Sequence, residues 1–227
     1  MSTEAEKRVK AARMRGFTVI ELMVATAVFA VLLIVITVGI LQISRVYYKG
    51  VTESNTQTTA RRITDTISQA IQFSGSTVTI TDPSAVPGSS YGFCIGNEQF
   101  SYTTGYQVVD NPASDKFQSY HGLVQRTVAG CTDSTPPQNV RAASVEGREL
   151  LAPNMRLSKL NIVLIGPNLY RVDVRVVYGD DDLLQSPSDS GSPQAATRQD
   201  ASCISATAGT QFCAVSELST IVRKRVQ

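Results

Sequence analysis

The stretch Arg15–Gln42, RGFTVIELMVATAVFAVLLIVITVGILQ, decides how this chain begins to fold. From Phe17 to Leu41 it is almost wholly apolar, long enough to cross the ~30 Å hydrocarbon core of a bilayer as a helix. Residues 1–16 precede it with five basic side chains against two glutamates. Because positively charged flanks stay in the cytoplasm, we expect Tyr47 and everything after it to lie outside.

One residue does not fit a simple membrane anchor. Glu21 lies inside the apolar run, where a carboxylate costs about 2.5–3.5 kcal/mol and usually has a function. A secretory signal peptide is a poor alternative, because its apolar region spans only about 7–15 residues and ends at a small-residue cleavage site. A plain signal anchor explains the length and the charges, but leaves Glu21 without a reason.

The order of residues around Glu21 supplies a reason. A basic leader is followed by Gly16, Phe17 and then Thr-Val-Ile-Glu-Leu-Met-Val. This order resembles the class III signal of type IV prepilins and type II secretion pseudopilins. The resemblance implies that a membrane prepilin peptidase cuts between Gly16 and Phe17 and methylates the new terminus at Phe17. It is strong over residues 10–42 and extends to the rest of the chain only in general layout.

The same resemblance assigns a role to the carboxylate. Glu21 of an incoming subunit is expected to pair with the methylated amine of a neighbouring subunit during filament assembly, because opposite charges attract strongly where water is scarce. The implied partners are other pilin subunits, the prepilin peptidase and the pilus assembly platform in the membrane. The role is structural, and neither a cofactor nor a catalytic residue is expected.

Composition and motifs point away from enzymes and nucleic-acid binders. The net charge is +2 and the isoelectric point about 8.4, with no basic stripe interleaved with aromatics. The sequence has no GxSxG, P-loop or HExxH motif. His121 has no evident partner and is interpreted as a surface histidine. Asp180–Asp182 lacks the ligand spacing of a calcium loop, so a solvated turn is favoured over a cation site.

Four cysteines, all beyond the apolar run, suggest disulfides formed in an oxidising compartment. They are Cys94, Cys131, Cys203 and Cys213. Four unrelated buried thiols are the alternative. Of the three connectivities that four cysteines allow, 94–131 with 203–213 is favoured because closing sequence-local loops costs less entropy. No metal site is expected, since one histidine and no CxxC pair do not make a zinc site.

The pattern predicts an α+β, pilin-like fold. A helix from Phe17 to about Phe73 is expected to pack its second half on an antiparallel sheet, through apolar stripes at 43–51 and 60–71. The expected divisions are a cytoplasmic leader 1–16, a transmembrane and assembly helix 17–41, an amphipathic helix half 42–73 and an extracytoplasmic β-rich domain 74–227.

The expected strands follow the helix. They are Thr77–Thr81, Tyr91–Ile95, Gly122–Val128, Lys159–Ile165 and Leu169–Tyr178. The last two would form a hairpin through Gly166-Pro167-Asn168, with one face of the second strand on the core and the other in solvent. Gln185–Ser202, rich in serine and proline, is expected to be a polar loop.

The sequence therefore predicts a subunit of a type IV pilus, interpreted as a minor one because the mature chain is large and carries a long polar insertion. A type II secretion pseudopilin is the alternative within the same resemblance. A signal-anchored extracellular binding domain is the alternative from another class. The precursor is expected in the cytoplasmic membrane, with its bulk outside, before assembly into a surface pilus or a periplasmic pseudopilus.

Overall fold

A computed structural model describes residues 17–74, 78, 90–113, 117–132, 135–185, 201–204 and 209–225. The chain divides between Val46 and Tyr47 into two units, which are considered separately. One long helix, α2 (Val19–Phe73), begins in the first unit and ends in the second. With the antiparallel sheets that follow, it gives the α+β, pilin-like fold that the sequence predicts.

The part of α2 in the first unit is apolar on every side. An 18-residue window of the helix has a mean hydropathy of 2.9, and none of that window is buried. Between Glu21 and Arg45 there is no charged residue. In length and composition this segment can cross a membrane, as the sequence predicts.

The part of α2 in the second unit is amphipathic. Ala60, Ile63, Ile67 and Ile71 recur every three to four residues and are fully buried in the main core. The second of the two expected stripes is therefore confirmed. The first stripe, 43–51, is exposed, with Tyr47 at 67% of its full accessibility.

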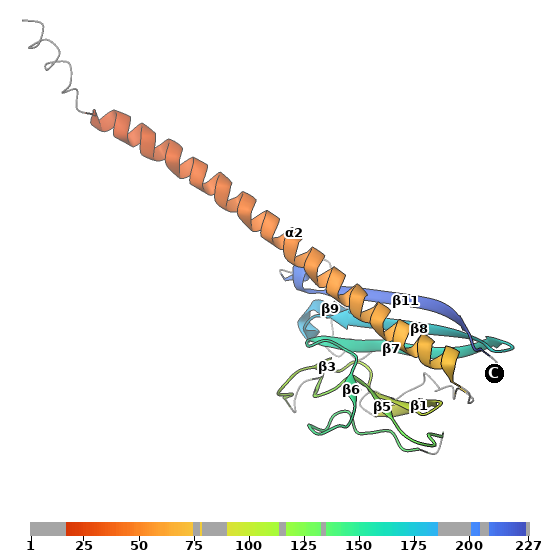
Figure 1. Cartoon of the computed structure of the whole chain (residues 1–227). Helices are drawn as coiled ribbons and strands as arrows, with labels where there is room; N and C mark the ends of the chain where they lie inside the picture. Colours follow the sequence, from red (N-terminus) through yellow and green to blue (C-terminus); the bar gives the residue numbers. More distant parts are fainter. Residues whose placement is uncertain are drawn as a thin grey trace, which may run out of the picture. The chain divides into compact units, whose positions relative to one another are not determined.

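The helix packs on a three-stranded antiparallel sheet with the order β11-β8-β7 (Figure 1). Its strands are β7 (Met155–Gly166), β8 (Leu169–Tyr178) and β11 (Ala214–Arg223). The β7–β8 hairpin matches the prediction, and Asn168 takes the positive φ of 58° that its turn needs. Strand β11 was not predicted; its burial pattern is irregular, with small and polar residues on its inward face.

A second antiparallel sheet completes the core, in the order β1-β2-β5-β6. Its strands are β1 (Tyr91–Ile95), β2 (Glu98–Tyr102), β5 (Leu123–Thr127) and β6 (Arg148–Glu149). Short pairs join β3 (Gln107–Val108) to β4 (Gln118–Ser119) and β9 (Leu184–Gln185) to β10 (Ser202–Cys203). Two 3-10 turns are η1 (Asp181–Leu183) and η3 (Thr210–Phe212).

Strand β8 corrects one expectation. Its inward residues Val172 and Val174 are fully buried, as predicted. Its other face is not simply solvated, because Val177 lies in a second small core with Leu183 and Leu184.

Of the remaining expectations, Thr77–Thr81 lies outside the described residues except for Val78, which bridges to Ile95. The expected loop lies outside the described residues between positions 186 and 200, but its two ends correct the expectation, because Gln185 and Ser202 pair in the short strands β9 and β10 and Ala201 is buried.

Candidate functional site at the helix N-terminus

The helix begins with a capping box that holds Glu21. Thr18 precedes the first helical residue, and its Oγ1 accepts a hydrogen bond of 3.3 Å from the backbone N–H of Glu21. In return, Oε2 of Glu21 accepts hydrogen bonds of 3.0 Å from both the backbone N–H and the hydroxyl of Thr18. This reciprocal arrangement satisfies backbone donors that a helix start leaves without partners.

The capping box gives the carboxylate a role within its own chain, and sequence reasoning missed it. The signal was present, because Thr18-Val-Ile-Glu21 has the T-x-x-E spacing of a capping box. Only Oε2 of Glu21 accepts hydrogen bonds among the described residues. Its Oε1 is therefore open to a donor from another molecule, and Phe17 beside it is 82% exposed. Gly16 lies outside the described residues.

The four cysteines stand as two pairs. Cys94 and Cys131 have their Cα atoms 5.7 Å apart, and Cys203 and Cys213 have theirs 5.8 Å apart. Both pairs are disulfides, and the described residues include no free cysteine. The structure thus brings together the two pairs that loop closure favours.

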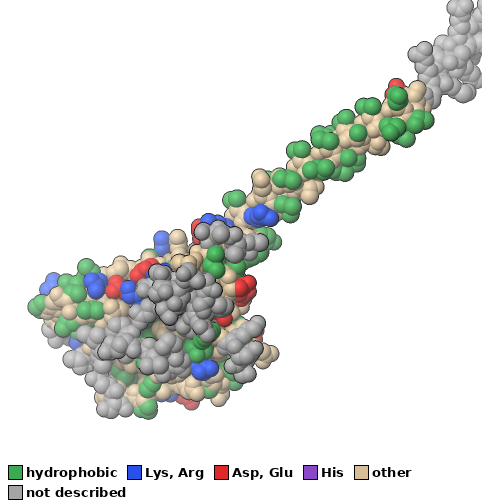
Figure 2. Space-filling view, turned by 180° about the vertical axis from the view of Figure 1, so that it is seen from behind, with side chains coloured by type: hydrophobic (Ala, Val, Ile, Leu, Met, Phe, Trp, Pro, Cys, Tyr) green, Lys and Arg blue, Asp and Glu red, His purple; other side chains and the backbone are tan. Residues whose placement is uncertain are grey.

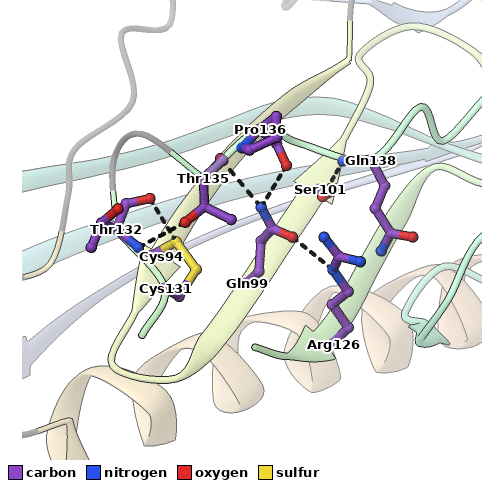
Figure 3. The surroundings of a disulfide bond; sticks show 9 residues. All are labelled: Cys94, Gln99, Ser101, Arg126, Cys131, Thr132, Thr135, Pro136 and Gln138. Atoms are coloured by element: carbon purple, nitrogen blue, oxygen red, sulfur yellow. Dashed lines mark hydrogen bonds between the residues drawn. A yellow bond between two sulfur atoms is a disulfide. The ribbon is translucent and has the colours of Figure 1, made fainter. Parts of the chain in front are cut away.

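The Cys94–Cys131 disulfide anchors a segment that crosses the second sheet, which we call the strap (residues 135–138) (Figure 3). The side-chain amide of Gln99 donates to the carbonyl oxygens of Thr135 (3.4 Å) and Pro136 (3.0 Å). The backbone N–H of Gln138 donates to the hydroxyl of Ser101 at 3.0 Å. The strap covers polar side chains of β2 that would otherwise face water.

The acidic triplet is more than a solvated turn. Asp180 and Asp182 are exposed, but Asp181 forms an ion pair of 2.6 Å with Arg156, whose side chain is fully buried. Arg156 also donates to the carbonyl oxygens of Gly179 (2.8 Å) and Gly105 (3.2 Å). Burial lowers the pKa of Arg156, and the nearby Asp181 and Asp180 partly offset this. Asp181 is the counterion of a buried charge.

His121 has a partner, contrary to expectation. Its Nδ1 lies 3.4 Å from Oε2 of Glu149, and its side chain is only 26% exposed. The carboxylate of Glu149 also accepts backbone N–H bonds from Gly122, Leu123 and Leu151 at 2.9–3.0 Å. Burial raises the pKa of Glu149, although these N–H bonds and His121 act in the opposite direction. The pair joins the segment just before β5 to β6.

None of these groups makes a metal centre. Within the ranges that the structure describes, no three His, Cys, Asp or Glu side chains are placed to hold a metal ion. The residues with chemistry of interest are therefore the capped carboxylate and the exposed terminus of α2.

Comparison with protein families agrees with this location of the site. The family model of the prokaryotic N-terminal methylation motif matches residues 12–37, which include Gly16, Phe17 and Glu21. The chain thus carries the class III signal of a type IV pilin-like prepilin. No curated protein and no solved structure matches the chain.

The motif has general consequences for the protein. It is typical of a structural, non-enzymatic family whose members assemble with other pilins through membrane machinery. With the apolar start of α2, it indicates a precursor anchored in the membrane. The motif supports a type IV pilin-like protein, and the structure adds a helix long and apolar enough to cross a membrane and two disulfides.

Proposed function

We propose that this protein is a minor subunit of a type IV pilus, stored as a membrane precursor and inserted into the filament by its N-terminal helix. The observation that carries the proposal is the start of α2, where an uncharged, wholly exposed apolar segment begins at a capped carboxylate. Such a surface is stable only in lipid or against other apolar surfaces. When the subunit leaves the membrane, its apolar segment must therefore pass from contact with lipid to contact with other subunits.

Processing would prepare the terminus for that exchange. Prepilin peptidase would cut between Gly16 and Phe17, leaving leader 1–16 behind, and the amine of Phe17 would be methylated. That amine has a reference pKa of about 7.7–8.0 and stays cationic after methylation. Positions 17–41 then form the transmembrane and assembly segment, 42–73 the amphipathic half, and 74–227 the domain outside the cytoplasm.

Glu21 would serve assembly through the oxygen that its own cap leaves open. Oε2 is held by Thr18, which fixes the orientation of the carboxylate. Oε1 takes no part in this cap among the described residues, and would accept a hydrogen bond from the methylated amine of a neighbouring subunit. Each of these charges is costly in a medium poor in water if it stays unpaired, so the correctly registered subunit is favoured.

Filament recovery of a Glu21 variant and a neighbouring control variant tests this role. We expect Glu21→Ala to insert into the membrane at least as well as the native chain, because an apolar residue costs less in lipid, but to be lost from sheared filaments. Normal recovery of Glu21→Ala in filaments would remove the assembly role. Leu22→Ala, next to the carboxylate but without charge, is the matched control and should assemble.

The two alternatives are separated by where the product accumulates. A type II secretion pseudopilin would be processed in the same way but found in periplasmic fibres and not in surface pili. A signal-anchored binding domain would keep residues 1–16 and never appear in a filament. Fractionation of surface filaments, periplasm and membrane, probed with one antibody, distinguishes the three results.

A further inference from the structure

A cavity of about 250 Å³ opens where four elements of the second unit meet. Its polar lining comes from Gln107 of β3, Asn154 just before β7 and Asp180 just after β8. Phe212 of η3 and Tyr178, the last residue of β8, supply aromatic walls. One water molecule takes about 30 Å³ in the liquid, so the cavity has room for a ring-sized molecule and not only for a single ion or water.

The polar side chains of this cavity have hydrogen-bonding capacity that the protein itself does not use. Gln107 is 4% exposed, and its Nε2 donates to Oδ1 of Asp180 at 3.0 Å. Because a carboxylate can only accept, this orientation of the amide leaves Oε1 of Gln107 without a donor among the described residues. Oδ2 of Asp180 and the side-chain amide of Asn154 likewise form no hydrogen bond within the described part of the chain. An unpaired polar atom on a buried side chain is costly, so the cavity favours a polar occupant.

The charges near the cavity disfavour an ionic occupant. The fully buried guanidinium of Arg156 lies 2.6 Å from the carboxylate of Asp181 and also attracts Asp180. Arg156 therefore weakens the pull of Asp180 on a cation, while the carboxylate of Asp180 itself repels an anion. No three His, Cys, Asp or Glu side chains in the described ranges are placed to hold a metal ion. A neutral molecule with several hydroxyl groups meets these conditions, because each hydroxyl both donates and accepts.

The aromatic wall fits the apolar side of such a molecule. Phe212 is 44% exposed, and its backbone N–H donates to the carbonyl oxygen of Gly209 at 2.8 Å. The next residue, Cys213, forms the disulfide to Cys203, which further fixes the backbone beside the ring. The face of an aromatic ring carries negative potential and attracts C–H groups, which are slightly positive. A sugar ring has hydroxyl groups at its edge and C–H groups on its face, so it can meet the open polar atoms and Phe212 together.

A longer groove continues from the cavity. It has a volume of about 560 Å³ and shares Tyr178 and Phe212 with the cavity, and its other lining residues include Tyr48, Thr52 and Asn55. Lys, Arg, Asp and Glu side chains are scattered over the face of the globular part that Figure 2 shows. Among the described residues, no charged side chain lines this groove. Uncharged hydroxyl, amide and aromatic side chains along the groove suit further sugar units.

We propose that the cavity binds one sugar ring of a neutral glycan and that the groove accommodates the sugar units next to it. Hydroxyl groups of the ring donate to Oδ2 of Asp180 and Oε1 of Gln107. The side-chain amide of Asn154 donates to another hydroxyl, and the C–H face of the ring packs on Phe212. This binding site goes beyond the proposed function, because it gives the globular part a ligand and does not depend on how the helix is processed or assembled.

Binding of the full chain to a panel of purified oligosaccharides tests the proposal. The panel holds neutral oligomers of glucose, galactose, mannose and N-acetylglucosamine, together with sulfated and sialylated oligomers. The detergent has no sugar headgroup that could compete. We expect at least one neutral oligomer to bind in titration calorimetry, with an affinity that changes less than about twofold between about 0.05 and 0.5 M salt, because no ion pair is formed. Chelation of divalent cations with EDTA should leave the affinity unchanged.

Two substitutions with matched controls locate the site. Asn154→Gly removes the amide, and glycine adopts the positive φ of 62° at this position without strain. Asn168→Gly is its control, because this turn residue has a similar φ of 58° and does not line the cavity. Phe212→Ala removes the ring, and Phe73→Ala, at a phenylalanine that is 66% exposed and lines neither cavity nor groove, is its control. We expect Asn154→Gly and Phe212→Ala each to weaken binding about tenfold or more, and each control to stay within about twofold of the native affinity.

A panel in which no neutral oligomer binds at up to about 10 mM would overturn the proposal, because the cavity would then hold water only. Binding restricted to charged oligomers, binding that needs a divalent cation, or binding that Asn154→Gly and Phe212→Ala leave unchanged would do the same. Thermal unfolding shows whether each variant is folded. If Phe212→Ala is not, Phe212→Leu replaces it, because leucine fills the space without an aromatic face. Filament recovery of Glu21→Ala is a separate measurement, so the glycan site and the proposed function can fail independently.

Discussion

Glu21 combines a negative charge with an oxygen that caps the helix, and substitutions can separate the two properties. Glu21→Gln keeps a side-chain oxygen that can accept from Thr18 but removes the charge. We expect Glu21→Gln to form a normal helix and yet to be lost from filaments, like Glu21→Ala. Sheared-filament recovery together with membrane levels is the measurement. Filaments that accept Gln as well as Glu would show that capping, and not charge, explains the residue.

Thr18 provides the complementary test. Thr18→Ala leaves the charge of Glu21 intact but removes the hydroxyl that donates to its carboxylate and accepts from its N–H. Loss of such a cap typically costs about 0.5–2 kcal/mol of helix stability. We expect fewer filaments from Thr18→Ala, and rescue by Thr18→Ser, which restores the hydroxyl. Equal recovery of Thr18→Ala and the native chain would contradict a positioning role for Thr18.

The buried ion pair of Arg156 and Asp181 is costly to break. Removing one partner of a buried ion pair typically destabilises a protein by about 3–5 kcal/mol, whereas an apolar replacement of the whole pair is often tolerated. Asp181 is 24% exposed, which reduces the effect, so we expect roughly 2–4 kcal/mol for Asp181→Ala. Denaturant unfolding is the measurement. Asp182→Ala, an exposed neighbour, is the control and should change stability little.

Glu149 should make stability depend on pH, with a direction that follows from its burial. Burial raises its pKa above the ordinary value of 4.5, so the folded chain binds its proton more tightly than the unfolded chain does. The stabilising contribution is full below about pH 4.5 and is lost as the pH rises through the folded pKa. We expect the difference in free energy of unfolding between the native chain and Glu149→Gln to fall as the pH rises through that window. A difference that rises with pH would contradict the direction.

At the scale of elements, what could be predicted depends on how evenly a strand buries its residues. Strand β8 alternates buried valines with charged residues, so its bounds follow from the sequence. Strand β11 places Ala214 and Ser216 on its inward face as well as Val222, and exposes Ile221, which hides the alternation. Its place is set by pairing with β8, a long-range contact that no local pattern reports. The helix could be predicted from local sequence alone, because its apolar residues are either continuous or spaced at helical intervals.

The strap makes a prediction for the second sheet. A Cβ added to Gly92 would lie 2.7 Å from Cβ of Pro137 and 3.2 Å from the carbonyl oxygen of Phe100, so the strap would have to shift. We expect Gly92→Ala to lower the free energy of unfolding by about 1–3 kcal/mol, as overpacking does. Gly166→Ala is the control, because its nearest neighbour would be an ordinary 3.7 Å away. Equal effects of the two substitutions would contradict close packing of the strap.

The disulfides should contribute unequally. The 94–131 pair closes a separation of 37 residues and the 203–213 pair one of 10. From loop-closure entropy we expect the first disulfide to contribute roughly 4 kcal/mol to the free energy of unfolding and the second about 3 kcal/mol. Unfolding of the two double Cys→Ala variants measures this. A larger loss from removing the shorter loop would show that packing around Cys213, and not chain entropy, dominates.

At the scale of the whole molecule, the proposed minor role concerns abundance. A large chain with polar insertions is tolerated where few copies are needed, but takes up room along a repeating fibre. We expect quantitative mass spectrometry of sheared filaments to find this chain as a small fraction of the protein. If it is the dominant component, the minor assignment fails while the pilin-like assignment survives.

The central claim is that residues 1–16 are a leader and that the working protein begins at Phe17. Mass spectrometry of the N-terminal peptide of the membrane-bound chain tests it directly. We predict a peptide that starts at Phe17 and is one methyl group heavier than its sequence, and a Gly16→Leu variant that keeps residues 1–16, because Gly16 alone lets the backbone approach the peptidase without a Cβ. A native chain that still begins with its leader, or a Gly16→Leu chain that loses it, would contradict the account.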